Sequence, residues 1–160
     1  MRSILDALHP APEAPAGGTP MIAVDTSVIV DLLGDDRHAD AAESCLRDAM
    51  SHGPVVACEV VVSEVVAGFG RSSQLIDTLD EMGLGFSALE LRAATRAGEM
   101  QRRYNERLKA AGRPPVSPRT VPDFLIGAHA LLQCTALITR DAGFFRDYFK
   151  GLKVIVPKAA

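Results

Sequence analysis

Short hydrophobic runs alternate with longer amphipathic segments along most of this chain. The runs are rich in Val, Ile, Leu and Ala, which is typical of buried strands. They cover residues 22–24, 55–57, 136–139 and 153–156, and residues 83–86 form a weaker candidate. Aromatic residues make up only 5% of the chain, and a core of small aliphatic side chains suits a parallel sheet covered by helices.

The segments between these runs carry apolar residues at helical spacing. They predict helices over residues 28–33, 37–51, 72–82, 88–110, 122–133 and 144–149, and another that carries Val61, Glu64 and Val65. Thr26 or Ser27 can cap the first helix, and Ser72 or Ser73 the helix over 72–82. The long helix over 88–110 is expected to turn Leu91, Ala94, Ala97, Met100 and Tyr104 inward. The alternation predicts a three-layer α/β/α sandwich with a mainly parallel sheet of about four to five strands.

Residues 1–20 differ from the rest, because prolines alternate there with Ala and Gly. We expect a flexible Pro/Ala-rich arm over residues 1–20 and one folded domain over residues 21–157. Neither a signal-peptide core nor a membrane-spanning stretch is recognisable. Cys45, Cys58 and Cys134 lie far apart in apolar surroundings. Such cysteines are typical of reduced core thiols, which favours a cytoplasmic protein.

Basic residues are concentrated in one part of an acidic chain. The net charge is −3, yet residues 92–119 hold eight basic and two acidic residues, a charge of +6, so the remainder carries −9. A basic segment on an acidic body can hold phosphates beside a carboxylate site. A solvated helix face with Glu–Arg pairs is the equal alternative.

Four acidic residues interrupt apolar segments: Asp25, Glu64, Asp123 and Asp141. Taken singly, each has an ordinary explanation, as a helix-capping, solvent-facing, first-turn or turn residue. Taken together, Asp25 and Asp141 follow strands, and Asp123 begins a helix. The carboxyl ends of parallel strands meet at one edge, so the acids are expected to share a site there. Four clustered carboxylates need a cation, and Mg²⁺ or Mn²⁺ suits such oxygen ligands.

The segments around these acids resemble the PIN-domain nucleases, and among them the VapC-like toxins of type II toxin–antitoxin systems. The resemblance covers about residues 21–157. It rests on Met-Ile-Ala-Val-Asp25-Thr-Ser, Val-Ser-Glu64-Val-Val, Val-Pro-Asp123-Phe-Leu-Ile-Gly-Ala-His and Leu-Ile-Thr-Arg-Asp141-Ala-Gly-Phe-Phe.

The resemblance implies a metal-dependent endoribonuclease that acts as the toxin of a toxin–antitoxin pair. It implies that Asp25, Glu64, Asp123 and Asp141 bind Mg²⁺, with Mn²⁺ possible as the ion, and carry the catalysis. Thr26 or Ser27 would orient Asp25 or a water on the metal, and Thr139 would support Asp141. RNA is then the substrate, a small antitoxin the protein partner and a homodimer the expected assembly. Arg113 and Arg119 are candidate contacts to the RNA backbone.

Two other functions remain open at this point. A PIN nuclease of RNA processing would keep the same site without a toxin role, and a non-catalytic nucleic-acid-binding module would have lost an acid. A phosphatase of the aspartyl-phosphate type is disfavoured, because position 27 is Ser where that chemistry wants a second Asp. Asp147 and His129 are expected to be a surface acid and a packed helix histidine.

Overall fold

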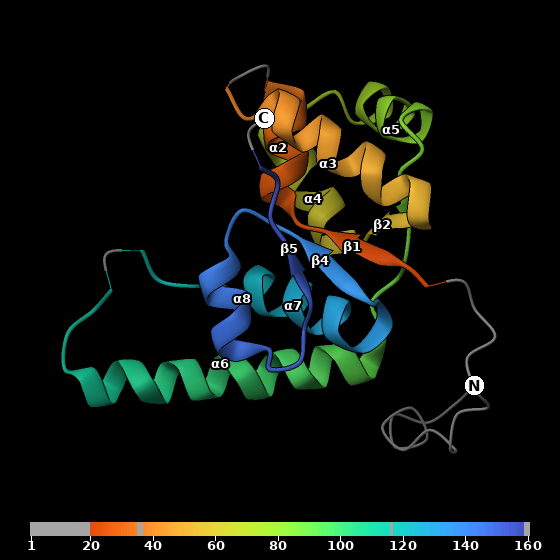
Figure 1. The fold of residues 1–160 in the computed structure, drawn as a ribbon. Coiled ribbons are helices and arrows are strands. Elements are labelled where there is room, and N and C mark those ends of the chain that lie inside the picture. Colours follow the sequence, from red (N-terminus) through yellow and green to blue (C-terminus); the bar gives the residue numbers. More distant parts are fainter. Residues whose placement is uncertain (1–19, 35–36, 116, 159–160) are drawn as a thin grey trace, which may run out of the picture.

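A single parallel sheet forms the centre of the molecule (Figure 1). The computed structural model describes residues 20–34, 37–115 and 117–158, so the predicted arm, apart from Pro20, lies outside the described residues. Five strands pair in the order β3-β2-β1-β4-β5, and every pairing is parallel. They are β1 (Ile22–Val24), β2 (Val55–Ala57), β3 (Gly85–Phe86), β4 (Ala136–Ile138) and β5 (Val154–Ile155).

Helices cover both faces of this sheet. They are α2 (Thr26–Gly34), α3 (Ala39–His52), α4 (Glu59–Phe69), α5 (Ser72–Glu81), α6 (Leu91–Ala111), α7 (Val121–Gln133) and α8 (Ala142–Tyr148). Figure 1 shows α2, α3 and α5 on one side of the sheet and α6, α7 and α8 on the other. Helix α4 contacts both α2 and α7. The predicted α/β architecture with a parallel sheet is therefore confirmed.

The order of the strands fixes where a site can form. The chain runs from β1 through β2 to β3 on one side of the sheet, then returns to β4 and β5 on the other side of β1. The central strands β1 and β4 are thus neighbours, although more than a hundred residues separate them. In open parallel sheets, a crevice forms beyond the carboxyl ends of strands where the order reverses. Asp25 and Asp141 follow these two strands.

On the side of the sheet covered by α6, α7 and α8, helix α7 packs closely against the end of α8. A Cβ added at Gly127 of α7 would lie 2.3 Å from Cε2 of Phe149. Phe149 is fully buried and stacks near Phe145. No side chain other than hydrogen fits at position 127 while the ring keeps its place. The glycine therefore sets how close α7 packs to this part of the core.

Three predicted local details are wrong. Helix α6 buries Ala97, Met100 and Tyr104 as predicted, but Ala93 completes the buried face, whereas Leu91 is exposed and Ala94 half-buried. The helix begins only at Leu91, so its first residue lies at the rim of the packed face. Thr26 and Ser27 lie inside the first turn of α2 rather than before it, because Val28 N–H already donates to the Asp25 carbonyl. Helix α5 likewise includes Ser72 and Ser73, and Arg71 precedes it with a left-handed φ of 48°.

The three cysteines are free thiols. Cys58 is buried, and Cys45 and Cys134 are half-buried. Burial raises the pKa of the Cys134 thiol to about 12, so this thiol is protonated and unreactive at neutral pH. Within the described ranges, no helix combines the length and apolar character needed to cross a bilayer.

His129 of α7 is a buried histidine, as predicted. Its Nε2 lies 3.1 Å from Ser87 Oγ, and its side chain is 1% exposed. Burial lowers the pKa of His129 from its ordinary value of 6.5, against the opposing charges of Glu59 and Glu90. The folded protein thus keeps this imidazole neutral where the unfolded chain takes up a proton.

Stability is therefore expected to fall in mild acid through His129. Below about pH 6.5 the unfolded state binds more protons than the folded state at this residue, so the free energy of unfolding decreases as the pH falls. The variant His129→Gln should lack this part of the pH dependence. Urea unfolding at pH 7.5 and 5.5 compares the two proteins, and parallel losses in both would contradict the assignment.

Candidate active site

Asp25 lies at the centre of a hydrogen-bond network at the carboxyl edge of the sheet. It follows β1 directly and is 8% exposed. Its Oδ2 accepts hydrogen bonds from Thr139 Oγ1 at 2.6 Å and from Ser27 Oγ at 3.0 Å. Burial raises the pKa of Asp25, the hydrogen bonds from Thr139 and Ser27 lower it, and the charge of Asp123 raises it further. A second carboxylate therefore lies close enough to disfavour ionisation of the first.

Thr139 joins Asp25 to Asp141. Strand β4 pairs with β1 so that Val24 faces Ile138, and the next residues, Asp25 and Thr139, meet by their side chains. The same Thr139 Oγ1 accepts the backbone N–H of Asp141 at 3.0 Å. One hydroxyl thus fixes the position of both acids. Ser27, and not Thr26, is the α2 hydroxyl that bonds to Asp25.

Glu64 approaches this network from α4. Thr26 Oγ1 donates to Glu64 Oε1 at 2.8 Å, so the two hydroxyls of the first α2 turn serve two different acids. Glu64 is an exposed residue. It reaches α2 because α4 packs against that helix. Its carboxylate therefore borders the network through Thr26 rather than through Asp25.

Asp123 lies in the first turn of α7 and accepts a hydrogen bond from the residue that precedes the helix. Its Oδ2 accepts the backbone N–H of Thr120 at 3.0 Å and lies 3.5 Å from Thr120 Oγ1. An acid in the first turn of a helix also meets the positive end of the helix dipole. The ordinary first-turn role of this residue is thus present, alongside its electrostatic contact with Asp25.

Arg119 brings a positive charge to the acids. Its guanidinium forms an ion pair with Asp141 and lies over the ring of Phe144, 4.4 Å from the centroid. The hydrogen bond that Arg119 donates to Asp141 is the main cause that raises the pKa of Arg119, and the charge of Asp123 contributes as well. The arginine therefore contacts one of the four acids and is influenced by the charge of a second.

The donors at this edge fit a hard divalent cation in their chemistry. All four are carboxylates, and the buried Asp25 is held by hydroxyls and an amide N–H rather than by a cation. Their present orientations are not those of ligands, since no three Asp, Glu, His or Cys side chains of the described ranges converge as around an ion. Asp123 turns to Thr120, Glu64 to Thr26, and Asp141 to Arg119. Rotation of these side chains would be needed for a cation to bind.

Two contacts beside the site have no clear signal in the sequence. Asp31 of α2 is buried at 2% exposure, and its Oδ2 lies 2.5 Å from Arg140 Nε in an ion pair without hydrogen-bond alignment. This pair joins α2 to the residue before Asp141. The hydroxyl of Tyr104 accepts the backbone N–H of Arg119 at 2.8 Å. The one available signal for the Asp31–Arg140 pair was that Asp31, a polar residue, stands among the apolar residues of α2.

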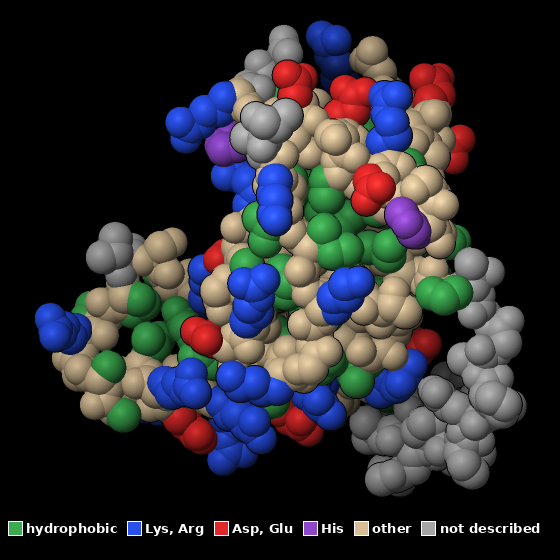
Figure 2. Space-filling view, in the orientation of Figure 1, with side chains coloured by type: hydrophobic (Ala, Val, Ile, Leu, Met, Phe, Trp, Pro, Cys, Tyr) green, Lys and Arg blue, Asp and Glu red, His purple; other side chains and the backbone are tan. Residues whose placement is uncertain are grey.

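Basic side chains gather over α6. Figure 2 shows Lys and Arg side chains along the side of the molecule that α6 forms. Some are paired on the helix itself, with Arg96 beside Glu99 and Arg102 beside Glu106. Arg107 lies over the ring of Tyr148. Helix α6 thus shows features of both interpretations of its charge. It carries Glu–Arg pairs, as a solvated helix face does, and it also has a net positive face that could hold phosphates.

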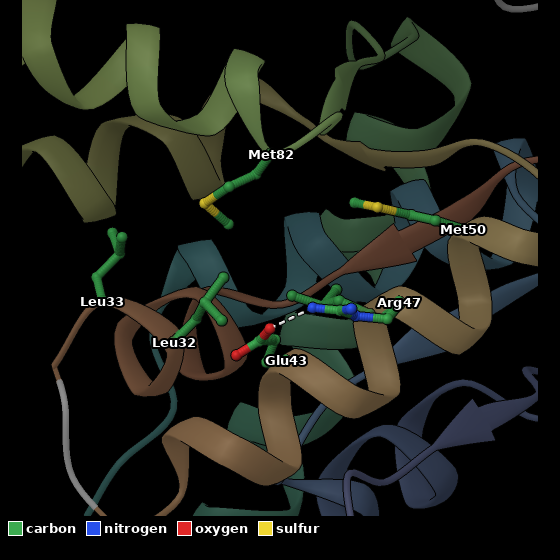
Figure 3. Close-up of a pocket in the computed structure, with 7 residues that line it drawn as sticks. Leu32, Leu33, Glu43, Arg47, Met50 and Met82 are labelled. Atoms are coloured by element: carbon green, nitrogen blue, oxygen red, sulfur yellow. Dashed lines mark hydrogen bonds and ion pairs between the residues drawn. The ribbon is translucent and has the colours of Figure 1, made fainter.

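An apolar groove lies between α2, α3 and the turn after α5 (Figure 3). It has a volume of about 490 Å³, and Figure 3 shows Leu32 and Leu33 facing Met50 and Met82 across it. The Glu43–Arg47 ion pair of α3 borders the groove. An apolar channel with a charged rim is suited to an amphipathic segment of another protein.

The fold has relatives among solved structures of toxin–antitoxin systems. VapBC2 from Rickettsia felis, bound to a promoter DNA fragment, matches at a TM-score of 0.61 and 18% identity, over 86% of this chain and 99% of that one. FitAcB from Neisseria gonorrhoeae matches at 0.57 and 20%, over 86% and 98%. VapC20 from Mycobacterium tuberculosis, described as a sarcin–ricin loop cleaving toxin, matches at 0.56 and 16%, over 82% and 98%. Identities this low establish a shared fold.

A comparison of the sequence with family models identifies the family to which the chain belongs. No curated protein matches the chain. The family model of the PIN domain, however, matches residues 22–150, a range that makes up most of the chain and contains all four acids. The resemblance to PIN-domain nucleases is thus confirmed as membership of the family, and the likeness to VapC-like toxins as a shared fold. This protein belongs to the PIN domain family.

Proposed function

We propose that this protein is a metal-dependent endoribonuclease and the toxin of a toxin–antitoxin pair. The observation that carries the proposal is the network in which Thr139 bonds to both Asp25 and Asp141 while Asp123 acts on Asp25 electrostatically. Three acids from three separated segments are thus linked at one edge of the sheet, by Thr139 and by charge, although their carboxylates do not converge. The solved relatives, which include a toxin described as cleaving the sarcin–ricin loop, support a cleaving enzyme, and RNA is the proposed substrate.

Asp25, Glu64, Asp123 and Asp141 are the proposed metal ligands, with Mg²⁺ as the ion and Mn²⁺ as its substitute. When bound, such an ion activates water for attack on the phosphodiester and stabilises the leaving oxygen. Ser27 and Thr139 hold Asp25 in place, and Thr26 positions Glu64. The low exposure of Asp25 keeps bulk water away from its carboxylate.

The basic α6 face and the loop after it are proposed to hold the RNA backbone. Arg113 lies in that loop as an exposed residue, and Arg119 at the end of the loop reaches Asp141. Phosphate contacts of this kind position a strand without reading its sequence. These contacts would guide the RNA strand from α6 toward the acids.

Purified protein is expected to cut RNA at internal positions, and only when Mg²⁺ or Mn²⁺ is present. Removal of the ion with EDTA should reduce cleavage by about a hundredfold or more, because water activation and charge stabilisation are lost together. Gel analysis of a labelled RNA measures the fragments. The variant Asp123→Asn, purified in the same way, controls for contaminating nucleases. Equal cleavage by this variant, or cleavage that persists in EDTA, would contradict the proposal.

A small antitoxin is the proposed protein partner. One solved relative, from Klebsiella pneumoniae, is described as a toxin–antitoxin complex. The groove with Leu32, Leu33, Leu46, Met50 and Met82 offers an apolar surface for an amphipathic segment of such a partner. Burial of the exposed apolar parts of this groove would provide affinity.

A homodimer is the proposed assembly. A second groove lies beside the edge strand β3, where Ile76 and Phe86 are exposed apolar residues. An edge strand with exposed apolar side chains favours pairing with another chain. This surface is therefore the proposed contact between two copies.

A further inference from the structure

Arg119 is held firmly by its backbone but loosely by its side chain. Its N–H donates to the hydroxyl of Tyr104, a buried residue of α6 whose ring packs against Phe124 and Tyr148. Its side chain is 31% exposed and has two partners, Asp141 and the face of Phe144. The guanidinium can therefore leave Asp141 without any movement of the loop.

The acid that Arg119 contacts is one that a divalent ion would also need. Asp141 and Asp123 both attract the guanidinium and contribute to the raised pKa of Arg119. A cation of charge +1 in this position offsets part of the repulsion among the acids. A divalent ion would compensate more charge and would compete with the arginine for the Asp141 oxygens.

We propose that Arg119 is an exchangeable cation of the acidic site, which pairs with Asp141 in the metal-free protein and binds an RNA phosphate once a divalent ion has taken Asp141. This inference rests on the proposed function. Phe144 would keep the released guanidinium beside the acids, because a cation is attracted to the ring face. A guanidinium held in this way can donate two hydrogen bonds to a phosphate. Metal binding would thus prepare the phosphate contact, and the two ligands would favour one another.

Calorimetric titration with Mn²⁺ alone tests the first half of the exchange. Arg119→Gln is expected to bind Mn²⁺ about three- to tenfold more tightly than the wild type, because the competing cation is gone. Arg113→Gln is the matched control, since it removes the same charge from an exposed position of the same loop. Arg119→Lys keeps the charge and should bind Mn²⁺ nearly as the wild type does. Equal or weaker Mn²⁺ binding by Arg119→Gln, or no Mn²⁺ binding by any of these proteins, would overturn the inference.

Steady-state cleavage of a short RNA at saturating Mn²⁺ tests the second half. Arg119→Gln should raise KM about tenfold and leave kcat nearly unchanged, because a ground-state phosphate contact is lost. A merely structural defect would weaken Mn²⁺ and RNA binding together, whereas the exchange predicts opposite changes. An unchanged KM would overturn the phosphate contact. If the wild type cuts no RNA at all, the proposed function fails, while the Mn²⁺ titration still decides whether Arg119 competes for Asp141.

Discussion

Replacement of Asp25 by Asn is expected to abolish RNA cleavage and to raise the melting temperature of the metal-free protein. The activity should fall by about a thousandfold or more, since Asp25 is the buried acid to which Thr139 and Ser27 both donate. The amide oxygen can still accept these two hydrogen bonds, so the fold is retained. Loss of activity with a more stable fold would separate the role of Asp25 in catalysis from any structural role.

The expected gain in stability follows from the raised pKa of Asp25. An acid whose pKa is raised by burial stabilises the fold while it is protonated, and this contribution is lost as the pH rises through the folded-state value. At neutral pH the ionised carboxylate therefore opposes folding, and Asn removes that charge. The difference in melting temperature between variant and wild type should thus be small near pH 4 and larger at pH 7.

Added Mg²⁺ or Mn²⁺ gives this prediction a second measurement. The ion should raise the melting temperature of the wild type and have little effect on Asp25→Asn, because only the wild type keeps all four carboxylate ligands. Asp147→Asn is the matched control, since Asp147 is an exposed acid of α8, and it should behave as the wild type. Full cleavage by Asp25→Asn would remove Asp25 from the proposed site.

Gly127→Ala is expected to destabilise the protein, whereas Gly98→Ala should stabilise it. Both glycines lie inside helices, so Ala is intrinsically the better residue by about 1 kcal/mol in each case. At position 98 an added Cβ meets no atom within 4 Å. At position 127 it meets the Phe149 ring at 2.3 Å. The net loss there should be about 1–3 kcal/mol, since overpacking outweighs the gain in helix propensity.

Urea unfolding of the two variants measures this difference in sign. A double variant, Gly127→Ala with Phe149→Leu, should lose less than the two single changes summed, because the smaller side chain makes room for the methyl group. Strict additivity would show that the contact with Phe149 is not the cause. Stabilisation by Gly127→Ala alone would contradict the close packing of α7.

The sheet was predictable because most of its strands are short apolar runs close to a Gly, a Pro or an acid, whereas the short β3 gave a weaker signal. The inward face of α6 was predicted less well. Its periodicity allowed two neighbouring faces, and only packing against α7 shows that Ala93, rather than Leu91 or Ala94, points inward. Local spacing cannot decide between faces one residue apart when small alanines occupy both.

The places of Asp25, Asp123 and Asp141 in the fold were predictable, while the hydrogen-bond partners of the four acids were not. Asp25, Asp123 and Asp141 stand at element boundaries, which the hydrophobic pattern reveals. Thr26 donates to Glu64 and Ser27 donates to Asp25. The first of these bonds depends on how α4 packs against α2, which is a long-range contact without a local signal in the sequence. The buried pair of Asp31 with Arg140 depends on the adjacency of β1 and β4 in the same way.

The pairing of β1 with β4 also has a consequence for synthesis of the protein. Asp25 and the Thr139 hydroxyl that holds it are 114 residues apart. A chain still growing on the ribosome therefore has no complete acidic site until β4 and the residues after it have emerged and joined β1. If the protein cuts RNA as proposed, the nascent chain is harmless to the messenger being translated, and a truncated product that ends before residue 139 is inactive for the same reason.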